Sequence, residues 1–197
     1  TTPGIEFLHS DASLFRTLGI GPTLPPNTGM MYGLQDARGQ DFATVKRYEE
    51  LILGHSGEFF LYAGVNELPP SLATMGVKYI LSDGAWRPPS KDFKPVYRGE
   101  MTIHRNPFFL ERAQLIAKHT VATPGEILAR VRDPRFDPRH TLLLEEEPAR
   151  ESAGERGNLK AAVRIKSYQP DEVVLEAASP GPAFVLLLDT YYPGWKA

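Results

Sequence analysis

The sequence has no cysteine among its 197 residues. This absence excludes disulfides, thiolate metal sites and cysteine nucleophiles. Long apolar runs are missing as well. The longest, Phe184 to Leu188, has the length of a strand and falls far short of the about 20 residues that cross a bilayer as a helix. The sequence starts at Thr1 without an initiator methionine or a signal peptide, so we expect it to be a piece of a longer protein.

An excess of either charge is also lacking. Twenty-two Lys and Arg residues stand against 24 Asp and Glu residues, for a net charge of -2. This balance argues against a nucleic-acid partner, which needs a basic surface, and no polybasic run is present to hold anionic lipid. A chain of this length buries roughly two-thirds or more of its unfolded surface. Its core therefore needs neither a disulfide nor a metal, and we expect no cofactor.

Apolar periodicity predicts an α+β fold. Helices are expected to begin at Ile5, at the N-cap Asp41, at Pro69 and at the N-cap Thr123. Strands are expected at 14–20, 77–81, 96–98, 101–104, 113–117, 141–144, 161–166, 173–175 and 184–188. This distribution suggests a mixed α/β part over 1–110, with a mixed sheet and a few short helices. A mainly antiparallel, sandwich-like β part would follow over 111–197, as a second domain or as a continuation of the first.

Local patterns predict finer features. Thr123, Pro124 and Glu126 have the spacing of a helix capping box. The pair 99–100, glycine first, suits a type II′ hairpin turn. The step from a helix into the strand at Val77 resembles half of a βαβ unit, so part of the sheet is expected to be parallel. The last three strands are joined by short turns and are expected to pair in order. A further strand is expected to run off the C-terminal end of the sequence.

A long loop over residues 21–39 is the candidate ligand surface. Loops of this length are usually functional or packed on something. Amide and carboxylate groups beside an aromatic ring suit a sugar, since they bond its hydroxyls while the ring covers its C–H face. The candidate ligand-binding residues are Asn27, Tyr32, Gln35, Asp36, Arg38 and Asp41. The alternative is a loop held by its own polar side chains, with Met30 and Met31 in the core.

A second group of polar residues could bind a metal. Asp133, Asp137 and His140 are all possible ligands. Pro134 and Pro138 forbid the helix that would place them on successive turns. We therefore favour an extended turn in which each aspartate bonds local N–H groups and neighbouring arginines balance its charge.

The remaining polar residues form no catalytic pattern in the sequence. The three carboxylates at 145–147 alternate in direction on a strand, so they predict a solvated strand end rather than a cation site. The five histidines are scattered, and the GxSxG, P-loop and GxGxxG motifs do not occur. We predict no catalytic residue and no metal ligand.

Several short segments, taken in order, resemble one family. They are Phe15-Arg16, Pro26-Asn27, Gly39-Gln40-Asp41, Met75 to Ile80, Tyr97, Asn106-Pro107, Phe136-Asp137-Pro138 and Tyr191-Tyr192-Pro193-Gly194-Trp195. Over nearly the whole chain they resemble the extracytoplasmic C-terminal region of YfhO-like bacterial membrane proteins. One position departs from the family: its usual Gly-Tyr-Asp is Gly39-Gln40-Asp41 here. The missing tyrosine weakens the transfer of any ligand role that it has.

The resemblance implies a setting and a role. YfhO-like proteins are polytopic and related to membrane glycosyltransferases that use polyprenyl-phosphate sugars. It thus implies an extracytoplasmic domain at the cell membrane, not catalytic by itself, which helps to position a glycan acceptor for a parent glycosyltransferase. The implied partners are the parent's own membrane helices and a glycan or polyprenyl-phosphate sugar.

Two other readings of the chain stay open. One is a structural or protein-interaction domain that packs on membrane helices. The other is a free-standing hydrolase with an unrecognised site. In the family, further segments follow the closing Tyr191–Trp195 motif, which implies that the sheet here lacks a strand and exposes an edge.

Overall fold

The chain forms two compact units. The computed structural model describes residues 1–38, 45–53, 72–133, 135–149 and 162–197. Residues 1–110 with 190–197 make up the first unit, and residues 111–189 the second. The fold is α+β, as predicted, with a few short helices, mixed sheets and a β-rich C-terminal part. Within the described ranges, no helix combines the length and the apolar character needed to cross a membrane.

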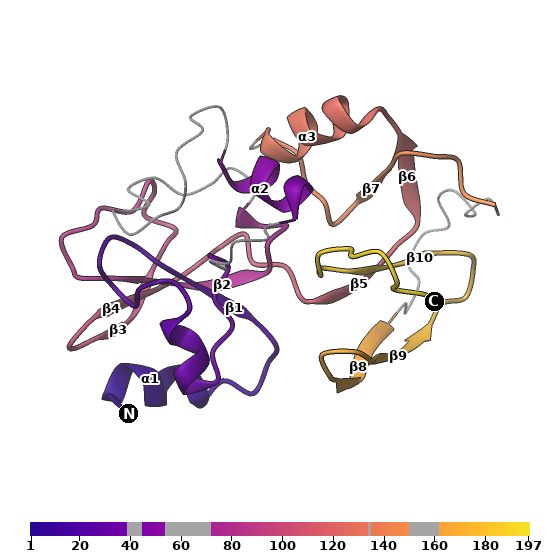
Figure 1. Cartoon of the computed structure of the whole chain (residues 1–197). Helices are drawn as coiled ribbons and strands as arrows, with labels where there is room; N and C mark the ends of the chain where they lie inside the picture. Colours follow the sequence, from indigo (N-terminus) through magenta and orange to yellow (C-terminus); the bar gives the residue numbers. More distant parts are fainter. Residues whose placement is uncertain (39–44, 54–71, 134, 150–161) are drawn as a thin grey trace. The chain divides into compact units, whose positions relative to one another are not determined.

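A four-stranded sheet of order β1-β2-β4-β3 forms the centre of the first unit (Figure 1). Its described elements are α1 (Pro3–His9), β1 (Arg16–Gly19), the 3-10 helix η1 (Thr28–Tyr32), α2 (Lys46–Leu53), β2 (Val77–Ser82), β3 (Pro95–Arg98) and β4 (Thr102–Arg105). Strands β1 and β2 are parallel, and the other two pairs are antiparallel. The predicted parallel part of the sheet is confirmed. The predicted helix starts at Asp41 and Pro69 lie outside the described residues.

Strand β2 is buried along its whole length. Successive side chains of a strand point to opposite faces, and β2 supplies Ile80 to one apolar cluster and Leu81 to another. The first core cluster consists of Leu18, Ile20, Ala37, Leu72, Met75, Val77, Ile80 and Phe93. The second core cluster consists of Ile5, Leu8, Leu34, Tyr79, Leu81 and Ile103. Apart from Lys78 and Ser82, the residues of β2 are apolar, as expected of a strand that is covered on both faces.

The hairpin between β3 and β4 forms where it was predicted, but its turn differs. Arg98 pairs with Thr102, which leaves a three-residue connection rather than a two-residue one. Gly99 does not have the positive φ that a type II′ turn needs. A Cβ at Gly99 would overlap the hydroxyl of Tyr97, which donates to Glu100 Oε2 at 2.6 Å. The glycine therefore makes room for a folded-back tyrosine side chain.

The second unit is made largely of paired strands. Its described elements are β5 (Ala113–Ile116), β6 (Lys118–Val121), α3 (Pro124–Arg132), β7 (Thr141–Leu144), β8 (Ala162–Tyr168), β9 (Val173–Ala178) and β10 (Phe184–Leu187). β6 and β7 pair in parallel, whereas β8 with β9 and β5 with β10 pair antiparallel. Strand β6 was not predicted, because its alternating polar and apolar residues are too few to distinguish it from a loop.

The predicted pairing of the last three strands in order is wrong. β8 and β9 form the expected hairpin, but β10 pairs with β5 instead of β9. Arg112 explains the choice, since its Nη1 donates to the Leu188 carbonyl at 3.2 Å and to Asp189 Oδ1 at 2.9 Å. The Leu188 backbone N–H donates back to the Arg112 carbonyl at 2.8 Å. These bonds hold the end of β10 beside the start of β5.

Helix α3 begins as predicted. The Thr123 hydroxyl accepts a bond from the Glu126 N–H, and the Glu126 carboxylate accepts one from the Thr123 N–H at 2.9 Å. Pro124 occupies the first turn, where its missing N–H costs nothing. The helix ends before Asp133. The predicted capping box is confirmed. It could be predicted from the sequence because all of its determinants lie within four consecutive residues.

The C-terminal residues 190–197 contain no strand, so the predicted strand at the end of the sequence is wrong. Gly194 has φ 118, and the Trp195 N–H donates to the Tyr192 carbonyl at 3.2 Å, which closes a turn. Proline at position 193 also removes a ladder donor. The aromatic side chains of this segment are exposed: Tyr191, Tyr192 and Trp195.

Candidate functional site

The candidate loop leaves the end of β1 and returns along the same strand. The Thr17 N–H donates to the Gln35 carbonyl at 2.8 Å, and the Ala37 N–H donates to the Thr17 carbonyl at 2.9 Å. Thr17 and Asp36 form an isolated parallel bridge. The end of the loop thus lies beside β1 as a short extension of the sheet, and its backbone is fixed by that strand.

A buried ion pair closes this loop. The side chains of Asp36 and Arg38 are each only 4% exposed. Arg38 donates to Asp36 Oδ1 from its backbone N at 2.8 Å and from Nε at 3.0 Å, and to Oδ2 from Nη2 at 2.7 Å. Nη2 also donates to the Leu24 carbonyl, which ties the start of the loop to its end. A Cβ at Gly19 would overlap the Thr23 carbonyl oxygen and lie 2.6 Å from Nη2, so glycine leaves room for the loop backbone and for the guanidinium.

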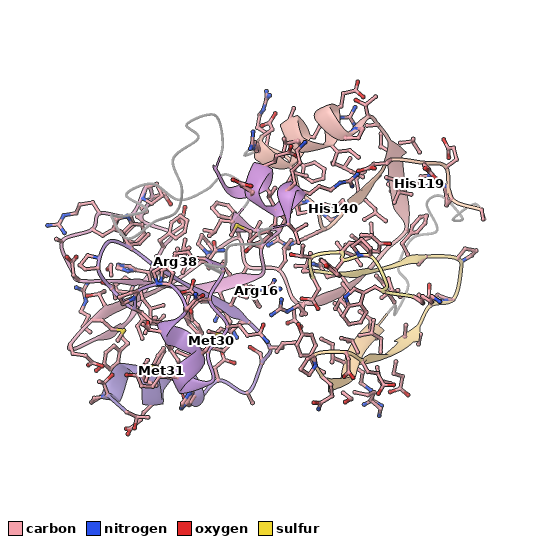
Figure 2. All side chains as sticks on the ribbon, viewed as in Figure 1. Arg16, Met30, Met31, Arg38, His119 and His140 are labelled. Carbon is pink, nitrogen blue, oxygen red and sulfur yellow. The ribbon has the colours of Figure 1, made fainter. Side chains whose placement is uncertain are left out.

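The burial of this pair changes what the candidate residues can do. Asp36 and Arg38 bond to each other inside the protein, and Figure 2 shows Arg38 at the sheet of the first unit. Neither side chain is presented to solvent, so both order the loop. A charge that is removed from water needs its partner and its hydrogen bonds, and this pair has both.

The other candidate ligand residues occupy different parts of the loop. Asn27 precedes η1 with φ 68, in the left-handed region. Tyr32 is half-buried and packs against the second core cluster. Gln35 accepts the Thr17 bond through its backbone carbonyl. Asp41 lies outside the described residues. Ligand binding by these residues stays a prediction.

The alternative reading is right that polar side chains of the loop hold it, as Asp36 and Arg38 do, but it is wrong that Met30 and Met31 lie in the core. Met30 is 70% exposed and Met31 is 82% exposed, and Figure 2 labels both on η1. The short helix is held between two left-handed residues, Asn27 and Gly33. His9 Nε2 lies 2.7 Å from the carbonyl of the last η1 residue. This fixed backbone turns both thioethers outward, so the loop presents an apolar pair.

A polar cluster around Lys78 was not predicted. Lys78, on β2, has an 11% exposed side chain and forms an ion pair with Asp11. Its Nζ donates to Ser13 Oγ at 2.7 Å, and the Tyr79 hydroxyl donates to Asp11 Oδ2 at 2.8 Å. Three rings lie within 5.3–5.7 Å of the ammonium, measured to their centroids: Phe15, Tyr79 and Phe109. Aromatic faces attract a cation at such distances.

A serine, a lysine and an aspartate are residue types that occur in nucleophilic sites. The pKa of Asp11, however, fits a role in the fold better than a role as a base. The Ser13 hydroxyl lies 2.7 Å from Asp11 Oδ1. Burial would raise the pKa of Asp11, but hydrogen bonds from Lys78, Ser13 and Tyr79 outweigh it and hold that pKa well below its usual range. A carboxylate with so low a pKa is a weak base. Burial and the bond to Asp11 raise the pKa of Tyr79 to about 12. The cluster therefore joins the segment after α1 to β2.

A buried histidine on β4 is the third polar feature of this unit. His104 is 6% exposed and Ser82 is fully buried. Among the described residues, His104 Nδ1 and Ser82 Oγ have no hydrogen-bond partner. The Trp86 ring packs edge-on against the imidazole, with centroids 5.1 Å apart. Burial, with a smaller contribution from Arg98, lowers the pKa of His104, because removal from water and a nearby like charge both disfavour the charged imidazole.

This histidine should make the first unit sensitive to mild acid. The unfolded chain binds the His104 proton near pH 6.5, whereas the folded chain binds it only at lower pH. Stability should therefore fall as the pH drops below about 6.5, until the folded state is protonated too. We expect His104→Leu to weaken this dependence, as measured by urea midpoints between pH 7.5 and 5.5. His140→Leu, at a 79% exposed side chain, is the control. A parallel decline in wild type and His104→Leu would contradict the assignment.

The structure confirms the turn that was favoured over a metal site. Asp133 Oδ1 accepts the Arg135 N–H at 2.9 Å, and Asp137 Oδ1 accepts the Arg139 N–H at 3.0 Å. His140 Nε2 lies 3.7 Å from Asp137 Oδ2. Each aspartate thus bonds its own arginine. Across the described ranges, no group of three or more His, Asp or Glu side chains is arranged to hold a metal ion.

The carboxylates 145–147 follow β7 as an exposed segment, which confirms the predicted solvated strand end. Glu147 Oε2 lies 3.6 Å from His119 Nε2, and the Glu147 side chain is 79% exposed. The His119 imidazole packs against the Phe184 ring, with centroids 5.2 Å apart. This contact joins β6 to β10, so packing accounts for the position of His119.

Comparisons with protein-family models, with curated proteins and with solved structures found no match to this chain. In the first unit, the candidate loop is fixed along β1 and the buried charges bond to one another.

Proposed function

We propose that this chain is the extracytoplasmic domain of a bacterial membrane protein resembling YfhO-like proteins. In this proposal the domain is not catalytic by itself. It contributes a binding surface that positions a glycan acceptor for a parent protein related to lipid-linked-sugar glycosyltransferases. The ordered motifs support the setting, and the candidate loop supports the role.

The observation that carries the binding role is the anchoring of the candidate loop. The buried Asp36–Arg38 pair and the bonds to Thr17 fix the end of the loop on the sheet. A fixed loop loses little conformational freedom when it binds a ligand, which favours affinity. Tyr32 contributes a half-buried ring to the same loop, and Asn27 lies five residues before it, at the start of η1. A ring and an amide suit the C–H face and the hydroxyls of a sugar.

An NMR titration tests this role. The chain would be titrated with neutral sugars and with a soluble polyprenyl-phosphate analogue, and the amide shifts of residues 25–38 would be followed. We expect saturable shifts in this loop, and we expect Asn27→Gly, which removes the amide and tolerates the left-handed backbone at this position, to reduce them. Gln169→Ala, at an exposed turn of the second unit, is the matched control. The absence of any saturable shift in the loop would refute the glycan role.

A second candidate function is supported by the exposed methionines. Met30 and Met31 are both exposed on the loop, and contact surfaces are built from exposed apolar side chains. A domain that packs on membrane helices would use such a surface. Methyl NMR of Met-labelled protein with detergent micelles separates the two functions. Broadening of the Met30 and Met31 signals without sugar-induced shifts supports packing.

A further inference from the structure

The sulfur atoms of this chain are distributed unevenly between surface and core. With no cysteine, the four methionines carry all of the side-chain sulfur. Met75 is 2% exposed within the first core cluster, and Met101 is half-buried against the second core cluster. Met30 and Met31 are 70% and 82% exposed. Any sulfur-directed reagent in water therefore meets this pair first.

We propose that Met30 and Met31 form an oxidative modification site that reacts with hydroperoxides. In each reaction a thioether lone pair attacks one peroxide oxygen and the O–O bond breaks. The sulfur is oxidised to the sulfoxide, and hydrogen peroxide is reduced to water. An alkyl hydroperoxide leaves an alcohol instead. Each methionine takes up one oxygen atom, and a sulfoxide reductase can reverse the reaction.

The structure around the pair makes this reaction compatible with the folded state. The two side chains project from η1, whose backbone is held by the left-handed residues Asn27 and Gly33 and by the contact with His9 (Figure 2). Neither sulfur belongs to a core cluster, so a polar sulfoxide adds no buried polar group there. Oxidation converts the apolar pair into a polar one and leaves the sheet intact. Met75 would have to enter water before it could react, which requires local or global opening.

Peptide mapping measures the oxidation of Met75, of Met101 and of the Met30–Met31 pair separately. Trypsin cleaves after lysine and arginine, so the methionines fall into three peptides: residues 17–38 with Met30 and Met31, residues 48–78 with Met75, and residues 99–105 with Met101. The full chain would be exposed to limiting hydrogen peroxide at neutral pH. Samples would be quenched over time, digested and weighed by mass spectrometry.

We expect peptide 17–38 to gain two oxygen atoms at a rate close to that of N-acetylmethionine amide. Peptide 48–78 should react on the order of a hundredfold more slowly, because its sulfur is accessible only in opened states. In urea all three peptides should react at similar rates. Equal rates in the folded chain, or a peptide 17–38 that reacts far more slowly than the free amide, would overturn the proposal.

The double variant Met30→Leu/Met31→Leu is the matched control. It keeps the apolar surface and removes both reactive sulfurs, so oxygen uptake by peptide 17–38 should be lost while that of peptide 48–78 is unchanged. Both side chains lie mostly in solvent, so this variant should fold as the wild type does. The oxidation assay reads sulfur chemistry alone, and its outcome is independent of whether the loop binds a glycan.

Discussion

Replacing Asp36 with asparagine should lower the free energy of unfolding of the first unit by about 3–5 kcal/mol, the range observed when one partner of a buried ion pair is removed. Asparagine keeps the shape of the side chain and its oxygen acceptor but loses the charge. The Arg38 guanidinium cannot lose its own charge and would stay buried at 4% exposure without a counterion. Desolvation of this unpaired cation is the physical cause of the loss.

The chain contains a matched control for this experiment. Asp133 and Arg135 have the same spacing and the same bonds: Arg135 donates to Asp133 Oδ1 from its backbone N and from Nε, and to Oδ2 from Nη2 at 2.7 Å. The pairs differ in burial, since the Arg135 side chain is 89% exposed, and in the further bond from Arg38 to the Leu24 carbonyl. Asp133→Asn should therefore leave the unfolding midpoint close to that of the wild type, because water solvates the arginine.

Two probes make the comparison quantitative. Both tryptophans, Trp86 and Trp195, belong to the first unit, so their fluorescence reports Asp36→Asn. Far-UV circular dichroism also reports the second unit and thus Asp133→Asn. If both variants lost the same free energy of unfolding, the local Asp-x-Arg turn, rather than its burial, would determine the contribution of the pair to stability. A large loss in Asp36→Asn alone supports the anchoring of the candidate loop.

The same comparison shows why sequence reasoning found the candidate loop but misjudged its side chains. The pattern Asp-x-Arg is identical at 36–38 and 133–135, and the local bonds are the same in both. Burial depends on what the rest of the chain packs against them, such as Gly19 and the Leu24 carbonyl. The exposure of Met30 was missed because apolar residues usually lie inside, and nothing in the local sequence indicates which face of η1 is left uncovered.

The capping box and the buried strand were predicted well from local patterns, although the local turn at 99–100 was not, and the pairing of the last strand was missed. The capping box at Thr123 and the buried strand after Gly76 are encoded within a few residues. The pairing of β10 with β5 is accompanied by the bond between Arg112 and Asp189, which are far apart in sequence. Hydrophobic periodicity contains no information about such a contact.

The cluster around Lys78 is another contact between distant residues that the sequence pattern does not predict. Asp11 and Ser13 form a local turn that the polar sequence suggests, with the Ser13 N–H donating to Asp11 Oδ1 at 3.0 Å. Nothing in that turn indicates that its cation comes from β2. A lysine within an otherwise apolar strand segment is the one clue, because it needs a partner when it is buried.

Lys78→Met should lower the free energy of unfolding of the first unit by about 3 kcal/mol, because Asp11 loses its ion-pair partner at a largely buried position. Methionine keeps the length of the side chain and its contact with the rings of Phe15 and Phe109. The control is Lys46→Met, since the Lys46 side chain is 87% exposed and its ion pair measures 3.7 Å. That variant should change the midpoint little.

The pH dependence of Lys78→Met separates lost charge pairing from lost packing. The pKa of Asp11 is depressed in the folded state, so its contribution is present above about pH 4 and is lost as the pH falls toward the lower folded value. The Lys78 bond is the largest of those that lower this pKa. Wild type should therefore lose stability more steeply than Lys78→Met below about pH 4. If the two acid profiles keep the same slope, the lysine acts through packing on the rings, and the ion pair with Asp11 contributes little.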